Sequence, residues 1–231
     1  MIKKHIISLL LFLLITTASA QKKQFKPEWN VGIGFGPTFS SMSFETSKSV
    51  RNLNTKNKQQ FLGGIAVRYL SEKNLGLIAE LNYSQQGWAQ DFRDTPQYEH
   101  SHQLNYFELP ILTHIYFGDK VRFIVNLGPK LSFLLSDSEK INQKLIDYLA
   151  SGGFPQGSPS YQYYHMAERK IDYGLMGGIG LEFQSGIGNF ALEGRYTFGL
   201  GDIYNNSKAD YFTRSANRVL SVKLTYYVKL F

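Results

Sequence analysis

The feature that most constrains this chain is an alternation of apolar and polar residues that recurs along most of its length. In LGLIAELNYS, Leu75, Leu77 and Leu81 share one face of an extended chain, while Glu80 and Asn82 share the other. Successive side chains of a β-strand point to opposite faces, so this pattern is typical of strands with one apolar face. We predict eight strands, at residues 29–44, 59–70, 75–90, 102–117, 121–135, 168–184, 189–203 and 216–231.

The connections between these strands alternate strictly in length. Those at 71–74, 118–120 and 185–188 are tight, whereas those at 45–58, 91–101, 136–167 and 204–215 are long and polar. An up-and-down barrel with short turns at one rim and long loops at the other produces this rhythm. Barrels of the bacterial outer membrane keep their short turns in the periplasm, and an even strand number then leaves both termini periplasmic.

Two kinds of barrel fit the alternation. A soluble lipocalin-like barrel would turn its apolar face inward around a ligand, whereas a transmembrane barrel turns it outward to lipid. The glycines favour the second, because they lie on the polar face, where they leave room in a narrow lumen: Gly32, Gly34, Gly36, Gly174, Gly178 and Gly180. We therefore predict an all-β fold, an eight-stranded antiparallel up-and-down transmembrane β-barrel with long extracellular loops.

The N-terminus has the three parts of a secretory signal. Lys3 and Lys4 precede an apolar run at 6–15, and Ala18-Ser19-Ala20 is a small-residue cleavage site. The run is shorter than the roughly 20 residues that a membrane-spanning helix needs. We predict a signal peptide at 1–20 and one barrel domain at 21–231, located in the outer membrane of a Gram-negative cell.

Composition limits the chemistry. The chain has no cysteine, which excludes disulfides and thiol catalysis. Its formal net charge is +7, from 25 basic and 18 acidic residues. A nucleic-acid partner does not suit an exported chain, whereas attraction to anionic lipid or lipopolysaccharide phosphates does. A mildly basic solvated surface explains the charge equally well.

The predicted inward face carries both signs of charge. An eight-stranded barrel has an interior just wide enough to be filled by side chains, and buried charges need partners. We therefore predict a salt-bridged plug, with a narrow ion path as the alternative. His114 lies nearby in the same phase. The predicted lumen network is Arg68, Glu80, Glu108, Arg122, Lys130, Glu182, Glu193, Arg195 and Lys223.

Two stretches resemble a known family. NYFELPIL at 105–112 and NLGPKLSFLLSD at 126–137 resemble strands of the PorT-like outer-membrane β-barrel domains of Bacteroidetes. The signal, the glycine-rich first strand and the aromatic C-terminus extend this resemblance over the mature chain. It implies an integral outer-membrane protein and, for PorT itself, a part in type IX protein secretion and gliding. The same motifs occur in relatives without that role.

The final strand, LSVKLTYYVKLF, resembles the C-terminal aromatic signal that the barrel assembly machinery recognises. We expect Tyr226, Tyr227 and Phe231 to form that signal. Phe231 falls in the lumen phase rather than the outward phase usual for such a signal, so an ordinary aromatic at the barrel rim is the alternative.

The long segment 136–167 predicts a short helix. Ile141, Leu145 and Leu149 recur at helical spacing, and Ser136 with Glu139 is typical of a capping box. We predict a helix at about 138–150. Its apolar stripe would either cover the barrel mouth or dock a partner, with the aromatic residues at 161–165 adding contact area.

No motif predicts catalysis. GIGFG at 32–36 lies inside a strand with no following helix, so the dinucleotide fingerprint fails. His100 and His102 share one side of an extended chain, but spacing fixes no third metal ligand. A lipid-modifying enzyme would need a histidine, an acid and a Ser or Asp together at the outer rim. Besides the two histidines, Asp91, Asp94 and His165 supply these residue types, but no motif places them together. We expect no catalytic residue, no metal and no cofactor.

These observations predict a non-catalytic outer-membrane barrel that works through interactions with envelope components. The expected partners are outer-membrane lipid and lipopolysaccharide, the barrel assembly machinery and secretion-system proteins. The alternatives are a lipid-modifying enzyme and a narrow solute channel.

Overall fold

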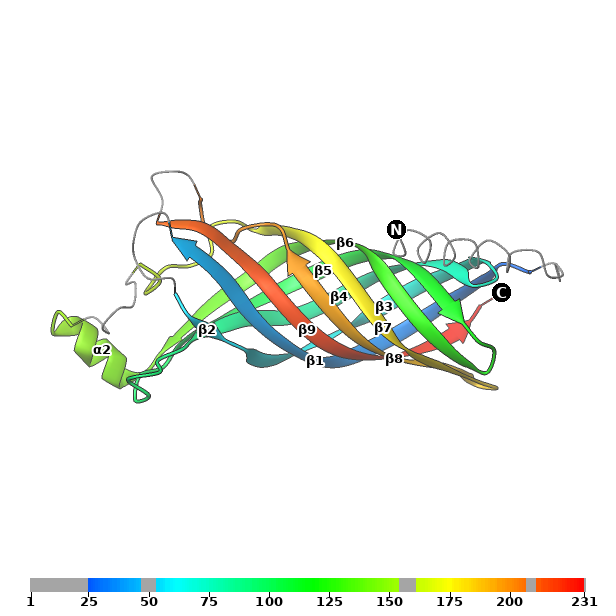
Figure 1. The fold of residues 1–231 in the computed structure, drawn as a ribbon, viewed down its shortest axis with the longest axis horizontal. Helices are drawn as coiled ribbons and strands as arrows, with labels where there is room; N and C mark the ends of the chain where they lie inside the picture. Colours follow the sequence, from blue (N-terminus) through cyan, green and yellow to red (C-terminus); the bar gives the residue numbers. More distant parts are fainter. Residues whose placement is uncertain (1–24, 47–52, 154–160, 207–210, 231) are drawn as a thin grey trace, which may run out of the picture.

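The protein forms a closed antiparallel β-barrel (Figure 1). The computed structural model describes residues 25–46, 53–153, 161–206 and 211–230; the predicted signal at 1–20 and Phe231 lie outside them. Eight long strands build the wall: β1 (Glu28–Thr46), β3 (Lys58–Glu72), β4 (Leu75–Gln90), β5 (His100–Phe117), β6 (Val121–Ile141), β7 (Ile171–Ser185), β8 (Gly188–Gly199) and β9 (Phe212–Lys229). A two-residue strand, β2 (Thr55–Lys56), pairs with the outer end of β4.

Each long strand pairs with its chain neighbours, and β1 pairs with β9 from Asn30↔Lys229 to Thr46↔Phe212. The β4–β5 pairing completes the ring. Closure satisfies backbone groups that would otherwise face lipid unpaired, which is why only closed sheets span membranes as strands. The predicted eight-stranded up-and-down barrel is confirmed.

The short turns and the long loops lie at opposite ends. Glycine is required in the turn after β5, because Gly118 has a φ of 110° and a Cβ there would lie 2.3 Å from the Val121 carbonyl oxygen. The start of β1 and the end of β9 lie beside these short turns, and the Leu230 amide donates to the Trp29 carbonyl.

The strands follow the predicted order, but their ends differ at two long connections: β8 ends at Gly199 rather than at 203 and β9 begins at Phe212 rather than at 216, and the third long connection differs most. β6 continues six residues past the predicted end at 135, because 136–141 pairs with the start of β5. The expected capping box at Ser136 and Glu139 is therefore wrong, since their backbone groups belong to a sheet. Helix α2 (Gln143–Ala150) starts later, and the side chain of Asn142 caps it by accepting a hydrogen bond from the Leu145 amide.

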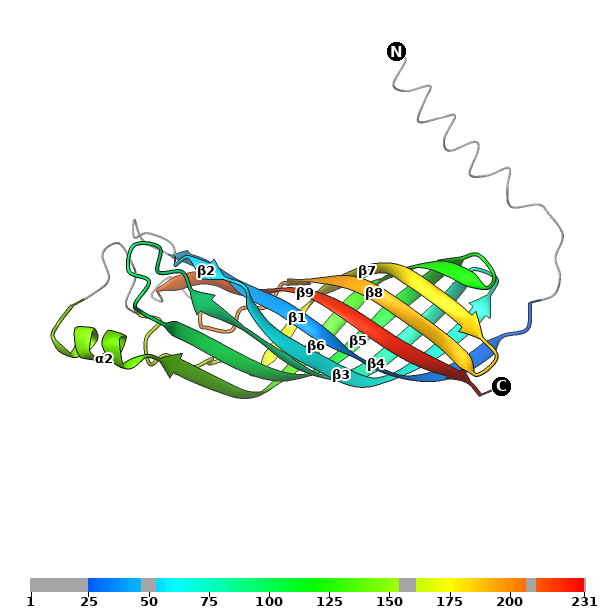
Figure 2. The ribbon, with the colours of Figure 1, turned by 90° about the horizontal axis from the view of Figure 1, so that it is seen from below.

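Helix α2 extends beyond the strand ends on the long-loop side in both views (Figure 1, Figure 2). Leu145 is fully buried and packs with Phe92 and Tyr163, so the apolar stripe contacts the chain's own loops. Within the described part of the chain, no helix is long and apolar enough to cross a membrane.

The outer surface of the barrel carries a continuous apolar belt. Along β1 the apolar outward residues run from Trp29 through Phe39, and above them the outward positions are Ser41 and Ser43. Along β5 the change comes at Phe107, above which Asn105, Gln103 and Ser101 face outward. The strands therefore extend well past the lipid-facing belt on the long-loop side.

Candidate functional site

The inward face below the long loops is a network of paired charges. The nine residues predicted from sequence all point into the barrel, and the side chains of eight of them are at most 4 % exposed, with Arg122 at 13 %. Alternation alone brings them inward, because each occupies the polar phase of its strand.

Glu80 on β4 is the centre of this network. Arg195 on β8 donates to both of its carboxylate oxygens, at 2.8 and 2.9 Å, and Lys223 on β9 donates at 2.7 Å. Arg195 also contacts Glu193 at 2.7 Å. The bonds that Arg195 and Lys223 make to Glu80 cross the lumen between strands far apart in sequence, so they join opposite walls of the barrel.

The remaining charges form two further groups. Glu182 accepts from Arg68 and, at 3.3 Å, from Arg122. Glu108 accepts from Lys130 and from Gln86. Every one of the four predicted acids therefore has a cation within ion-pair distance, which offsets part of the cost of removing these charges from water.

Glycine makes room for the crossing side chains. A Cβ at Gly34 would lie 2.6 Å from Cε of Lys223, and one at Gly178 would lie 2.9 Å from Cγ of Arg195. The clustering of glycines on the polar face is thus a consequence of the crowded lumen.

Asp172 also lies in the inward phase of β7, although it is not among the residues predicted for the network. It is 2 % exposed and accepts from Asn217 at 2.9 Å. His114, noted as nearby, is buried and contacts the Asn126 amide oxygen at 2.7 Å. The side-chain amides of Asn126 and Asn217 add further hydrogen bonds. They are uncharged, and alternation marks every inward residue alike, so neither signal distinguishes them in the sequence.

Apolar layers lie at both ends of the charged network. At the short-turn end, Leu70, Ile78 and Tyr116 belong to one buried cluster. At the long-loop end, Phe44, Trp88 and Tyr204 belong to another. The lumen is filled by side chains, in the manner of small barrels.

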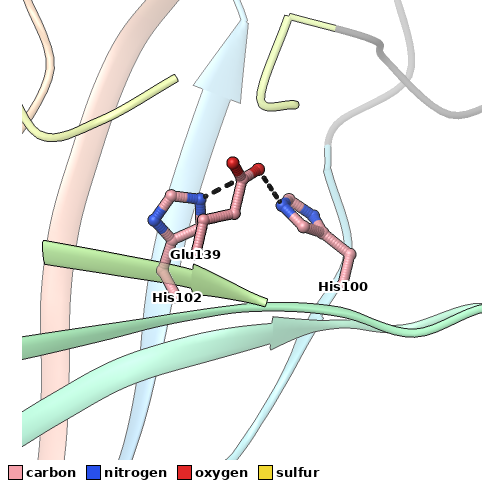
Figure 3. Close-up of side chains that lie close together, drawn as sticks. All are labelled: His100, His102 and Glu139. Carbon is pink, nitrogen blue, oxygen red and sulfur yellow. Dashed lines mark hydrogen bonds and ion pairs between the residues drawn. The ribbon is translucent and has the colours of Figure 1, made fainter. Parts of the chain in front are cut away.

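Beyond the belt, two histidines face one carboxylate. His100 and His102 are inward neighbours on β5, and Glu139 pairs directly with His102 across the β5–β6 ladder. The Nε2 atom of His100 lies 2.8 Å from Oε1 of Glu139, and that of His102 lies 3.5 Å from the same oxygen (Figure 3). Trp88 stacks on the His102 ring with centroids 5.0 Å apart.

The Nδ1 atoms of both imidazole rings also have polar partners. Nδ1 of His100 lies 3.1 Å from Oε1 of Gln90, and Nδ1 of His102 lies 2.8 Å from Oδ1 of Asp137. Burial opposes ionisation of Glu139, but the imidazoles of His100 and His102 beside it hold its pKa at about 2. Burial lowers the pKa of His100, whereas at His102 the carboxylates of Asp137 and Glu139 outweigh burial and raise the pKa.

The residues considered for lipid chemistry take other partners. Asp91 pairs with Arg93 at 2.8 Å, and His165 lies 3.8 Å from Glu168. Asp94 lies in the turn that joins β4 to β5. Asp91 and Asp94 thus share the connection between β4 and β5, whereas His165 lies in the connection that leads to β7.

The predicted assembly-signal residues face opposite ways. Tyr226 packs on Phe190 at the outer wall, with centroids 4.9 Å apart. Tyr227 is buried in the lumen beneath the Arg68 guanidinium, 4.1 Å from its ring centroid. Phe231 lies outside the described residues.

Tyrosines gather at the outer end. Tyr161 and Tyr164 are 60 % and 67 % exposed, and Tyr161 stacks on Tyr211 with centroids 3.9 Å apart. We call Tyr161, Tyr164 and Tyr211 the outer tyrosine patch.

A family model described as the outer membrane protein beta-barrel domain matches residues 19–205. No curated protein matches the sequence. Among solved structures, the chain is similar to OprG from Pseudomonas aeruginosa, with 11 % identity, 87 % of this chain and 96 % of that chain covered, and a TM-score of 0.53.

Two further structures are similar at lower TM-scores. Ail of Yersinia pestis, in complex with the heparin analogue sucrose octasulfate, is 15 % identical over 87 % of this chain and 99 % of that chain, with a TM-score of 0.43. Neisserial surface protein A is 11 % identical over 89 % and 100 %, with a TM-score of 0.45. At 11 % identity, the likeness to OprG shows the fold alone.

Proposed function

This chain belongs to the family of outer membrane protein beta-barrel domains and resides in the outer membrane, and from that premise we propose that it is a closed, non-catalytic barrel that binds other envelope components. The observation that carries the proposal is the filled lumen. Its charges are paired across the barrel, and apolar clusters lie on both sides of them. Such an interior supports neither solute passage nor a substrate pocket.

The outer tyrosine patch is the surface we assign to partner binding. Tyrosine is enriched in protein interfaces because it offers a large contact area and a hydroxyl at low entropic cost. The stripe of α2 is already occupied by Phe92 and Tyr163, which favours the exposed tyrosines over the helix as the contact surface.

The PorT-like resemblance makes a type IX secretion component the partner that we propose for this patch. We further propose that 1–20 is removed as a signal peptide, that both termini are periplasmic, and that the barrel assembly machinery inserts the chain through its last strand. Lipopolysaccharide and outer-membrane lipid would contact the outer wall. A lipid-modifying enzyme is disfavoured because Asp91 pairs with Arg93 and His165 lies beside Glu168, in two different connections.

Affinity purification from native membranes tests the partner. We expect secretion components to co-purify with the wild-type protein and to be reduced at least fivefold by Tyr161→Ser/Tyr164→Ser. The matched control is Arg93→Ser, at an exposed side chain in another long loop, and it should leave recovery unchanged. Recovery of assembly proteins and lipopolysaccharide alone would contradict the secretion role.

Recordings in planar bilayers test the closed lumen. We expect no steady conductance from the purified protein, because paired charges and aromatic side chains occupy the interior. A stable, large conductance would contradict the proposal and favour the channel alternative, whatever the outcome of the purification.

A further inference from the structure

The His100–His102–Glu139 cluster has the composition of a metal site, and that composition is not visible in the sequence. One ligand atom from each residue can be chosen so that the three lie within 4.8 Å of one another. Two imidazoles and one carboxylate are the protein ligands of a familiar class of zinc site, in which a fourth position stays open. The cluster lies outside the lipid belt, on the parts of β5 and β6 whose outward residues are polar.

The two imidazoles and the Glu139 carboxylate surround a position that a cation fits. Gln90 Oε1 and Asp137 Oδ1 are acceptors, so a neutral ring can carry its hydrogen on the nitrogen that faces one of them. Its Nε2 lone pair then faces Glu139, and a cation bound there would replace the ring hydrogens that otherwise donate to this carboxylate. The Nε2 of His102 is buried without a hydrogen-bond partner, because 3.5 Å exceeds the ordinary N–H···O length.

The surroundings match the outer shell of protein metal sites. Metal-binding histidines usually donate their other ring N–H to a carboxylate or carbonyl oxygen, which fixes the ring and its tautomer. Asp137 and Gln90 supply those acceptors here. Asp137 is itself fixed by the Ala167 amide at 2.7 Å, and Glu139 by the Tyr164 amide at 2.9 Å.

We propose that His100, His102 and Glu139 bind a divalent transition-metal ion, with Zn²⁺ the best fit to two imidazoles and a carboxylate. Atoms bound to one tetrahedral zinc lie about 3.3 Å apart, given bonds of about 2.0–2.1 Å. The contacts of 2.8 and 3.5 Å to Glu139 bracket that value. The ion fastens the returning segment 161–167 to the barrel, because the same two carboxylates already accept amides of that segment.

The test uses the mature protein purified from outer membranes, stripped with a chelator and titrated with Zn²⁺ alone. We expect one zinc per chain, and at least tenfold weaker binding in His102→Gln and in Glu139→Gln. Asp137→Asn should weaken binding about 10–100-fold, the range found when an outer-shell partner is lost. His114→Gln and His165→Gln are matched controls and should bind as wild type does.

A second measurement reports where the ion binds. In a Trp29→Phe background, Trp88 is the only tryptophan, and its ring lies about 5 Å from both imidazoles. Co²⁺ should quench its fluorescence with the same ligand dependence. Hydrogen exchange at the Tyr164 and Ala167 amides should speed up when the metal is removed.

Each variant is first shown to be folded by its heat-modifiable mobility in gel electrophoresis. Zinc binding in folded His100→Gln/His102→Gln as tight as in wild type would overturn the proposal. Failure of the wild-type protein to bind zinc would also overturn it, and would leave the cluster as a histidine–carboxylate ion pair. Neither result bears on partner binding, which the tyrosine variants test separately.

Discussion

The charged middle of the barrel and the histidine cluster at its outer end are built by neighbouring parts of the same wall, but their polar groups are completed differently. In the middle, each of the four predicted acids has a cation within ion-pair distance, from another strand for all but Glu193, so the acids are paired within the chain. In the outer cluster, carboxylates and imidazoles from β5 and β6 converge, and the donors that fix them are backbone amides. The first arrangement suits a structural plug and the second a site that accepts an ion.

Removing the central acid should have the largest effect. Glu80→Gln leaves Arg195 and Lys223 buried with much of their countercharge lost, and breaking a buried pair in this way costs about 3–5 kcal/mol. Urea unfolding in detergent micelles measures the loss. The control is Lys229→Gln, whose exposed pair with Glu28 should contribute less than about 1 kcal/mol. Equal losses for the two variants would contradict a network centred on Glu80.

The Glu108–Lys130 pair provides a second test of whether the buried charges stabilise the barrel as pairs. Glu108→Gln or Lys130→Met alone strands a buried partner and should cost about 3 kcal/mol. Removing both leaves no unpaired charge at that position, so the double variant should lose less than the sum, with a coupling of about 2 kcal/mol in a double-mutant cycle. Additive losses would show that the two residues act independently, for instance through Gln86 and Asp172.

Zinc should stabilise the outer region by a smaller amount. An ion that binds only the folded state adds about 2.7 kcal/mol at a hundred times its dissociation constant, so the Tm should rise with added Zn²⁺. Glu139→Gln should abolish the rise, whereas Glu80→Gln should keep it from a lower starting Tm. A rise that persists in Glu139→Gln would mean that zinc acts elsewhere on the protein.

The barrel could be predicted from sequence because its signals are local. The alternation of apolar and polar residues identifies the inward face of each strand, and the alternation of short and long loops identifies the up-and-down order of the strands. The charges in the lumen can therefore be predicted without knowing which residues pair. The histidine cluster could not be predicted in the same way. Its third ligand, Glu139, depends on the β5–β6 register and on a strand that continues to Ile141, whereas the local pattern around Glu139 indicates a helix cap.

The smallest effect should come from the rim of the charged network, where two arginines share Glu182. Arg68 is fully buried and stacks on Tyr227, whereas Arg122 is partly exposed and lies 3.3 Å from the carboxylate. Water screens Arg122 and Arg68 still neutralises Glu182, so Arg122→Gln should cost less than about 1 kcal/mol. Arg68→Gln should cost several times more in the same urea titration, since it leaves Glu182 with one weak, solvated partner. If the two variants unfolded at the same urea concentration, burial would not determine how much each ion pair of the network contributes to stability.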